Sequence, residues 1–419
     1  MIKEDVYCKK LKCGLDVYLI LKKGYKKKFA IYATRYGSID SEFIVPGENT
    51  PTKVPDGIAH FLEHKLFEKE YGNVFDKFAE FGASANAYTS YTHTAYLFSC
   101  TDNFEENLEL LIDFVQEPYF TEESIEKEKG IIEQELKMYS DDPNWQVFLN
   151  LLKAMYKAHP VRNDIGGTVD SIKYINAETL YKCYNTFYHP ENMVLLAIGD
   201  FNPEKIFNQI ENNFNSREYK PQGEITRIYP QEQDEINKNL IEEKLSVAEP
   251  LFFMGFKDRN VGFGGEKLFR KEITTRILLD MVLGRSSNLY KELYEDGLID
   301  DRFQIDYDGR KNYGYCVLGG PTQDPYTLHK RILEAIGKTK NILNEDTFER
   351  IKKKMVGNYI RGLNSQEFIS SVFVSYYFSD IDVFRYLDVL EKITFRDTLY
   401  RFEDLIDPNY HSCSIIMPE

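Results

Sequence analysis

Residues 100–136, CTDNFEENLELLIDFVQEPYFTEESIEKEKGIIEQEL, have a counterpart at residues 321–359, PTQDPYTLHKRILEAIGKTKNILNEDTFERIKKKMVGNY. Each stretch begins where a strand is expected to end and continues through a helix with the same spacing of Leu and Ile. Each then turns at a Phe-Thr-Glu-Glu or Leu-Asn-Glu-Asp cap into a second helix. A single repeat after about 200 residues indicates a duplicated domain rather than a solenoid.

The segments around this repeat predict an α+β fold. YHPENMVLLAIGD (188–200) resembles IDPNYHSCSIIMPE (406–419), and ASANAYTSYTHTAYLFSC (83–100) has the apolar spacing of two that is typical of strands. We therefore expect two homologous domains, each a largely antiparallel sheet with helices packed on one face. The polar stretch near 215–240 indicates a linker, which places the domains at 1–220 and 241–419 and the linker at 221–240. Helices are expected at about 56–67, 73–81, 103–116, 122–139 and 266–283.

The overall composition excludes several classes of protein. The chain has 419 residues, which is too long for one ordinary core, and 42% of them are hydrophobic, which excludes a disordered chain. The formal net charge of −15 argues against a nucleic-acid partner, and neither a secretory signal nor a membrane-spanning run of apolar residues is evident. The six cysteines are widely spread without a CxxC pair, so we expect reduced thiols and a cytoplasmic protein.

The stretch GIAHFLEHKLFE (57–68) carries the clearest chemical signal. In a helix that begins after Asp56 as N-cap, His60 and His64 lie on one face with Glu63 beside them. Two imidazoles in this arrangement can bind one zinc ion, and Glu63 can take a proton from its water. The other neighbours are apolar, and a buried His-Glu-His cluster without an ion would be costly. H-x-x-E-H is the inverzincin motif.

A third ligand is expected from an acidic residue on another element. The stretch SIEKEKGIIEQELKMYSDD (124–142) provides Glu128 and Glu135, two turns apart on one helix face, as well as Glu133. Spacing alone does not choose among these three carboxylates.

At this point the chain resembles the pitrilysin or insulinase family of zinc metallopeptidases, over nearly its whole length. The stretches that carry the resemblance are GIAHFLEHKLFE, ASANAYTSYTHTAY, IEKEKGIIEQEL, HPVRNDIGG and FYHPENMVLLAIGD. The resemblance implies that Glu135 is the third ligand of one Zn²⁺ per chain and that Glu128 supports the site. It also implies that Asn86 and Ala87 bind substrate at a sheet edge, where an extended peptide adds as a strand.

The resemblance also implies that each chain forms half of a clam-shell peptidase chamber. Its second half has no equivalent site, because LLDMVLG (278–284) stands opposite the HxxEH helix and Asn358 opposite Glu135. Family members that act alone or as homodimers carry an Arg and a Tyr in this half. Here Tyr294 and Asp300 stand at those positions, with Arg302 and Arg310 nearby. We therefore expect a heterodimer with a paralogous subunit that lacks the zinc motif, although the sequence also allows a homodimer.

These observations predict a zinc metalloendopeptidase that hydrolyses peptides or unfolded segments bound as an extended strand. Two alternatives remain open from the sequence. One is a non-catalytic structural or core subunit of a peptidase-like complex, and the other is a dedicated leader peptidase for a modified peptide.

Overall fold

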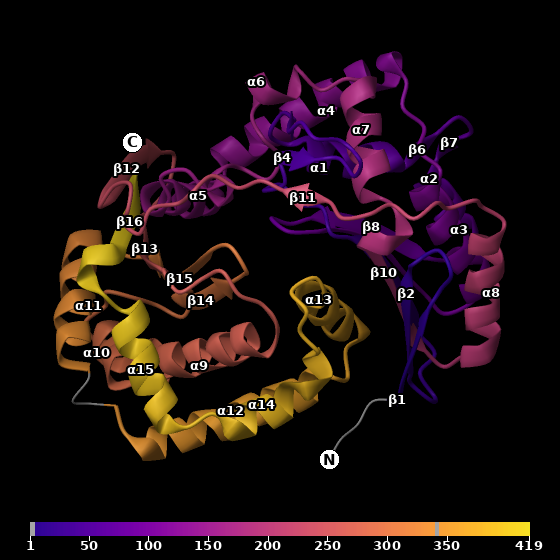
Figure 1. Cartoon of the computed structure of the whole chain (residues 1–419). Helices are drawn as coiled ribbons and strands as arrows, with labels where there is room; N and C mark the ends of the chain where they lie inside the picture. Colours follow the sequence, from indigo (N-terminus) through magenta and orange to yellow (C-terminus); the bar gives the residue numbers. More distant parts are fainter. Residues whose placement is uncertain (1–4, 340–342) are drawn as a thin grey trace. The chain divides into compact units, whose positions relative to one another are not determined.

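The computed structural model describes residues 5–339 and 343–419 (Figure 1). The chain forms two compact units, and both are discontinuous in sequence. Unit 1 comprises the residues up to Leu136, Asp164–Tyr229 and Leu363–Phe378. Unit 2 comprises Lys137–Asn163, Pro230–Gly362 and Ser379–Glu419.

Unit 1 combines a six-stranded sheet with helices and short two- and three-residue strands. Its elements are β1 (Asp5–Lys10), β2 (Asp16–Leu21), β3 (Lys28–Thr34), β4 (Glu42–Ile44), β5 (Thr52–Lys53), α1 (Ile58–Leu66), β6 (Glu68–Lys69), β7 (Gly72–Asn73), α2 (Val74–Glu80), β8 (Ser84–Thr89), β9 (Thr94–Cys100), α3 (Phe104–Gln116), the start of α4 (Glu122–Asp141), α6 (Val169–Ile172), α7 (Ala177–Phe187), β10 (Met193–Gly199), α8 (Pro203–Asn215), β11 (Thr226–Arg227) and α13 (Gln366–Tyr377).

The main sheet of unit 1 has the strand order β1-β2-β10-β3-β9-β8. Every neighbouring pair is antiparallel except β10 with β2. All seven residues of β10, MVLLAIG, are buried, because helices cover both faces of the central strands. Strand β8 forms one edge of this sheet, so one side of its backbone has no neighbouring strand in the sheet.

Unit 2 contains the second large sheet. Its elements are the end of α4, α5 (Pro143–Met155), β12 (Leu240–Leu245), β13 (Leu251–Lys257), α9 (Gly265–Leu283), α10 (Asn288–Glu295), β14 (Gln304–Gly309), β15 (Gly314–Pro321), α11 (Pro325–Thr339), α12 (Glu345–Gly362), α14 (Tyr386–Lys392), α15 (Phe395–Leu405) and β16 (His411–Pro418). Within the described residues, single-turn 3₁₀ helices also occur at Pro160–Arg162, Pro190–Asn192, Val383–Arg385 and Pro408–Tyr410.

The two sheets have the same topology, which confirms the predicted duplication and the α+β fold class. The order β12-β16-β13-β15-β14 in unit 2 repeats the order β2-β10-β3-β9-β8 in unit 1. In both sheets the first pair is parallel and the others are antiparallel. The helix pair α11 and α12 repeats α3 and α4, as the two matching sequence stretches predict.

The two sequence halves exchange one helix each. Helix α5, from the first half, packs against β13 and β16 in unit 2. Helix α13, from the second half, packs against β3 and β10 in unit 1, where Phe373 and Tyr377 contact the ring of Tyr18. The predicted domains, 1–220 and 241–419, are continuous segments and therefore do not describe two units that each contain a helix from the other half. Helix α13 also covers the second face of the unit 1 sheet, whereas the sequence predicted helices on one face.

The expected helices are present, with ends that differ by a few residues. The helix of the HxxEH motif is α1, and its N-cap is Gly57 rather than the predicted Asp56. Gly57 has a φ of +90°, a conformation that favours glycine. All six cysteines are free, as predicted. Among the described residues, no helix is long and apolar enough to cross a membrane.

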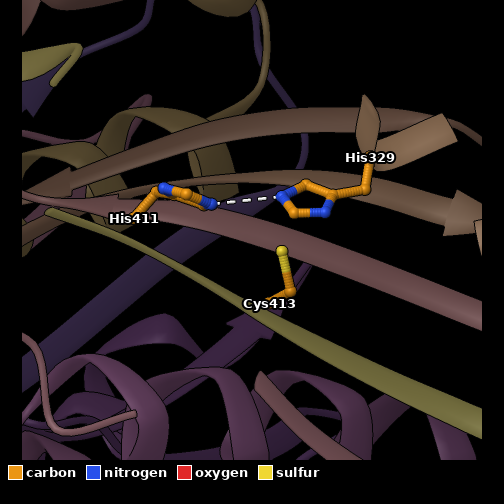
Figure 2. Close-up of side chains that lie close together, drawn as sticks. All are labelled: His329, His411 and Cys413. Carbon is orange, nitrogen blue, oxygen red and sulfur yellow. Dashed lines mark hydrogen bonds between the residues drawn. The ribbon is translucent and has the colours of Figure 1, made fainter. Parts of the chain in front are cut away.

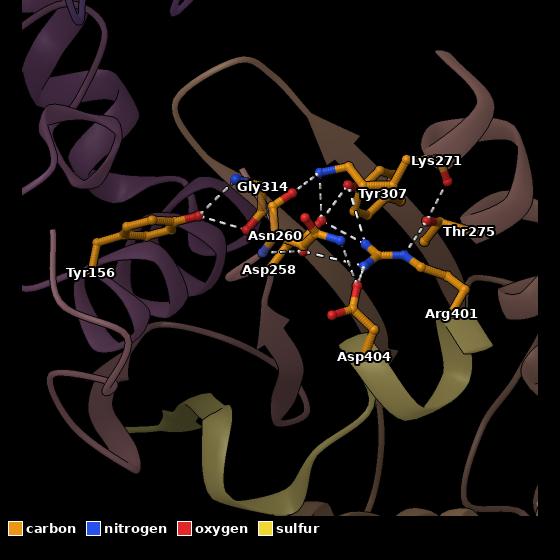
Figure 3. Close-up of polar contacts among 9 residues, drawn as sticks. All are labelled: Tyr156, Asp258, Asn260, Lys271, Thr275, Tyr307, Gly314, Arg401 and Asp404. Atoms are coloured by element: carbon orange, nitrogen blue, oxygen red, sulfur yellow. Dashed lines mark hydrogen bonds and ion pairs between the residues drawn. The ribbon is translucent and has the colours of Figure 1, made fainter. Parts of the chain in front are cut away.

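A buried charge cluster holds unit 2 together (Figure 3). The fully buried Asp258 carboxylate accepts hydrogen bonds from Arg401 (Nη2, 2.5 Å) and Tyr307 (2.5 Å) and lies 3.0 Å from Lys271 Nζ. Burial alone would raise the pKa of Asp258, but the charges of Arg401 and Lys271 outweigh it and lower the pKa to about 2. The cluster therefore ties the end of β13 to α9 and α15.

We expect Asp258→Asn to lower the free energy of unfolding of unit 2 by about 3–5 kcal/mol at pH 7, because two buried cations lose their partner. The measurement is urea unfolding followed by the fluorescence of Trp145, the only tryptophan, which lies in α5. The control is Asp306→Asn, whose exposed pair with Arg276 contributes about 1 kcal/mol or less.

The same cluster predicts a pH dependence. Since the folded-state pKa of Asp258 lies below its ordinary value of 3.8, its contribution is complete above that value and is lost as the pH falls toward about 2. The difference between wild type and Asp258→Asn should therefore shrink between about pH 4 and pH 2. A difference that stays constant over this range would contradict the assigned role of the carboxylate.

Candidate metal centre

Helix α1 is apolar around most of its circumference, and three of its polar side chains form one stripe, whereas the fourth, Lys65, is buried and paired with Glu68. Ile58, Ala59, Phe61, Leu62 and Leu66 are buried in the core of unit 1. The stripe on the remaining face consists of the two histidines and the glutamate of the HxxEH motif. The helix is therefore held by its packing, and the stripe is presented in a fixed orientation.

The start of α1 is fixed by a close approach of two backbones. A Cβ atom at Gly57 would lie 2.2 Å from the carbonyl oxygen of Gly166, so a side chain has no room there. A Cβ atom at Gly166 would in turn lie 3.6 Å from Nδ1 of His60. The Gly-Gly end of HPVRNDIGG therefore packs against α1 beside the histidines, a role that the sequence analysis did not identify.

Helix α4 brings the predicted third ligand to the stripe. Nε2 of His60 lies 3.7 Å from Oε1 of Glu135, and Nε2 of His64 lies 3.5 Å from Oε2. One donor atom from each of the three residues lies within 4.8 Å of the others. Of the three acids that the spacing left open, Glu135 is the one that lies beside both histidines.

Glu128 orients one of the histidines. Nδ1 of His64 lies 3.0 Å from Oε1 of Glu128, at which distance the imidazole N–H donates to the carboxylate. This bond leaves the lone pair on Nε2, the nitrogen that faces Glu135. A carboxylate behind a metal-binding histidine commonly fixes its tautomer in this way, which is the supporting role predicted for Glu128.

The pKa values of the group reflect burial and the nearby charges. Burial, followed by the neighbouring His64, lowers the pKa of His60 to about 3, so this imidazole is neutral at pH 7. Burial also acts to lower the pKa of His64, but the hydrogen bond that it donates to Glu128 and the charges of Glu63, Glu128 and Glu135 outweigh burial and raise this pKa. Burial raises the pKa of Glu135. Burial therefore makes the charged form of the Glu135 carboxylate unfavourable without a partner, and a bound cation would compensate for this.

Glu63 is held beside the three residues by a residue that sequence reasoning missed. Oγ1 of Thr89, on β8, donates a hydrogen bond of 2.8 Å to Oε2 of Glu63. Burial raises the pKa of Glu63 despite this bond. The alternation of β8 places Thr89 on the same face as Ala85 and Ala87, which pack against the core. This period of two along β8 was the signal in the sequence that could have identified the face on which Thr89 lies.

The two predicted substrate-binding residues lie on the edge strand β8. Asn86 is exposed and Ala87 is half-buried. The side-chain oxygen of Asn86 accepts a hydrogen bond of 2.9 Å from the backbone N–H of Ala87. The Asn86 amide therefore occupies a backbone donor at the sheet edge.

The donor set fits a zinc ion. Ligands about 2.0–2.1 Å from a tetrahedral zinc lie about 3.3 Å from one another, close to the measured separations of 3.5 and 3.7 Å. Two imidazoles and one carboxylate are a common three-residue set for a catalytic zinc.

Two family models match the chain. The model described as Insulinase (Peptidase family M16) matches residues 46–169, which include all the residues of the stripe and of α4 discussed above. The model described as Peptidase M16 inactive domain matches residues 174–355. The match to an inactive domain covers much of the second sequence half, in which LLDMVLG replaces the motif.

Relatives with names and structures agree with these matches. A relative from Bacillus subtilis with the name Uncharacterized zinc protease YmfH is 45% identical over 396 residues, covering 94% of this chain and 92% of its own length. The crystal structure of an M16-like peptidase from Alicyclobacillus acidocaldarius is 36% identical, with a TM-score of 0.96 over 100% of this chain and 99% of that one. A protease structure from Helicobacter pylori, 19% identical with a TM-score of 0.83, covers 100% of both chains and shares the fold.

We expect Glu135→Gln to reduce the metal content of the purified protein well below that of Glu133→Gln. Glu135 lies beside both histidines, whereas Glu133 on the same helix is not part of the cluster. Elemental analysis after dialysis against a weak chelator makes the comparison. Equal metal content in the two variants would remove Glu135 from the set of ligands.

Proposed function

The chain belongs to the insulinase family of peptidases, M16, and on that premise we propose that it is a zinc metalloendopeptidase acting on peptides or unfolded segments. The observation that carries the proposal is the grouping of His60, His64 and Glu135 with Glu63 beside them. These residues come from two helices, α1 and α4, and they are sufficient to explain the proposed chemistry.

His60, His64 and Glu135 would hold one zinc ion through Nε2, Nε2 and a carboxylate oxygen. When bound, zinc supplies Lewis-acid polarisation of the scissile carbonyl and lowers the pKa of a coordinated water. Glu128 keeps the Nδ1 proton of His64 in place, so that Nε2 stays available as a ligand.

Glu63 would act as the general base. It lies one residue before His64 on α1 and does not belong to the ligand group. Burial raises its pKa, which makes the carboxylate a better proton acceptor for an attacking water. The hydrogen bond from Thr89 fixes one oxygen and leaves the other to take the proton.

The substrate would bind as an added strand on β8. This strand is at the edge of its sheet, and α1 packs against it. An extended peptide that pairs with the edge needs the backbone N–H of Ala87, so it would displace the side chain of Asn86, which then becomes free to bind the peptide backbone. Folded substrates cannot pair in this way, which favours peptides and unfolded or leader segments.

The geometry of the centre bears differently on the two alternatives, a non-catalytic subunit and a dedicated leader peptidase. A non-catalytic subunit has no need for a histidine oriented by one acid, grouped with a second acid and flanked by a base held by a threonine. A dedicated leader peptidase would use the same centre, so it differs from the proposal only in the range of its substrates.

A heterodimer remains our proposal for the active assembly. Tyr294, at the position of the family's Arg, is 54% exposed on α10. The nearby Arg302 already donates hydrogen bonds to Asp300 and Glu249, and Arg310 is paired with Asp308 at 2.8 Å. Both guanidinium groups thus have carboxylate partners within unit 2, and we propose that a partner subunit supplies the oxyanion donor and raises the rate.

The test of the activity is Glu63→Gln, assayed against a peptide library. The amide keeps the shape but cannot accept a proton, so we expect zinc content to be retained and hydrolysis to fall by at least about a hundredfold. Glu133→Gln serves as the control and should leave hydrolysis near the wild-type rate. Unchanged turnover in Glu63→Gln would show that another group activates the water, and absence of turnover in the wild type both alone and with a paralogue that lacks the HxxEH motif would favour the non-catalytic alternative.

The test of the assembly is to assay the purified chain alone and after adding a paralogue from the same source that lacks the HxxEH motif. We expect a rate increase of about a hundredfold or more, since one missing oxyanion donor costs about that much. Full activity of the chain alone, with no response to the paralogue, would contradict the heterodimer.

A further inference from the structure

A second group of side chains of the types that ligate metals lies in unit 2, far from α1 in the sequence. His329 is on α11, and His411 and Cys413 are on β16 (Figure 2). One donor atom from each of the three lies within 4.8 Å of the others. Nε2 of His329 and Nε2 of His411 are 3.1 Å apart. Figure 2 shows the Cys413 sulfur directed at the space beside this pair.

The tautomer of His411 is set by the backbone. Its Nδ1 hydrogen-bonds the carbonyl oxygen of Pro408, so Nδ1 carries the proton and Nε2 presents a lone pair. A backbone carbonyl behind one nitrogen is a common way to orient a metal-binding histidine. His411 is therefore prepared to ligate through the nitrogen that faces His329.

The surroundings of the three side chains are apolar. Cys413 is 2% exposed, and the rings of Phe252 and Phe256 pack against His329 and His411 at centroid distances of 6.1 and 5.9 Å. Met254 pairs with Cys413 across β13 and β16, so its thioether lies on the same face of the sheet. The cluster thus offers soft donors at the boundary between a core and the surface.

A plain structural explanation covers part of this arrangement. The two imidazoles satisfy each other by a hydrogen bond, and a buried cysteine is common in a core. This structural explanation does not account for the position of the thiol, which points at a pair of histidines from two different elements. Imidazole nitrogens on one tetrahedral ion lie about 3.3 Å apart, close to the observed 3.1 Å.

We propose that His329, His411 and Cys413 form a second metal site, which takes a thiophilic transition-metal ion, Zn²⁺ or Cu⁺. Two imidazoles and a thiolate suit both ions, whereas Mg²⁺ and Ca²⁺ require oxygen donors. On binding, the Cys413 thiol releases its proton to solvent, and His329 turns its Nε2 lone pair to the ion while its proton moves to Nδ1. The bound ion joins α11 to β16, the last strand of the chain.

The experiment isolates this site by using His60→Ala/His64→Ala as the background. Co²⁺ replaces Zn²⁺ as the probe, because a thiolate ligand gives cobalt an intense charge-transfer absorption in the near ultraviolet. The donors on α1 and α4 contain no sulfur, so this signal can come only from a site with a cysteine. We expect about one cobalt ion per chain with this absorption, and a higher melting temperature when metal is added.

Matched variants separate the site from a general effect on folding. In the same background, Cys413→Ser and His329→Gln should lose the absorption and the thermal shift. Cys316→Ser should retain both, although Cys316 is equally buried on β15 of the same sheet. Circular dichroism verifies that each variant is folded.

The two candidate ions are distinguished by a competition. Anaerobic Cu⁺ that displaces cobalt at stoichiometric amounts while a large excess of Zn²⁺ does not would identify a copper(I) site, and displacement by Zn²⁺ a zinc site. Absence of a thiolate absorption in the background protein would overturn the proposal. So would an absorption that survives Cys413→Ser or disappears in Cys316→Ser.

Discussion

The candidate centre depends on the hydrogen bond between His64 on α1 and Glu128 on α4. It joins the two helices at 3.0 Å and decides which nitrogen of the imidazole remains available. Glu135, two turns further along α4, is then directed at the same stripe. The packing of α1 supplies the other half of the constraint, because a helix that is buried around most of its surface cannot rotate its polar stripe elsewhere.

Duplication has produced two units that pair their equivalent helices by different chemistry. In unit 1 the pairing of α1 with α4 uses imidazole and carboxylate groups. In unit 2 the corresponding helices are α9 and α12, and Asp280 forms an ordinary ion pair of 2.7 Å with Lys354. Leu278, Leu279 and Val282 of α9 enter the core at the place of the HxxEH motif. The same backbone arrangement is thus kept in unit 2 without a metal-binding stripe on that helix.

The sequence was sufficient wherever one local pattern determines one local structure. The repeat of 100–136 at 321–359 predicted the doubled sheet with its helix pairs, and the HxxEH spacing predicted that His60, Glu63 and His64 share one face. The choice of Glu135 over Glu133 was available only from the family resemblance, because helix spacing does not tell which face of α4 meets α1. In the structure it is Glu135 that lies beside both histidines.

What the sequence could not give depends on contacts between distant segments. The period of two in β8 indicates the face on which Thr89 lies but not that it will meet Glu63, and nothing in Gly57 indicates that the backbone of Gly166 will come so close that a side chain has no room. The exchange of α5 and α13 is of the same kind, since an apolar helix shows that it needs a partner but not which sheet provides it. For the same reason, single histidines at 329 and 411 gave no signal.

The two donor sets also differ in the ions that they suit. The set on α1 and α4 combines two imidazoles with a carboxylate, next to the proposed base Glu63. The set on α11 and β16 replaces the carboxylate by a thiol in apolar surroundings. A softer donor raises the affinity for copper(I) relative to harder ions. A metal at β16 would join α11 to β16 and act on the stability of unit 2, while the proposed hydrolysis would use the centre on α1 and α4.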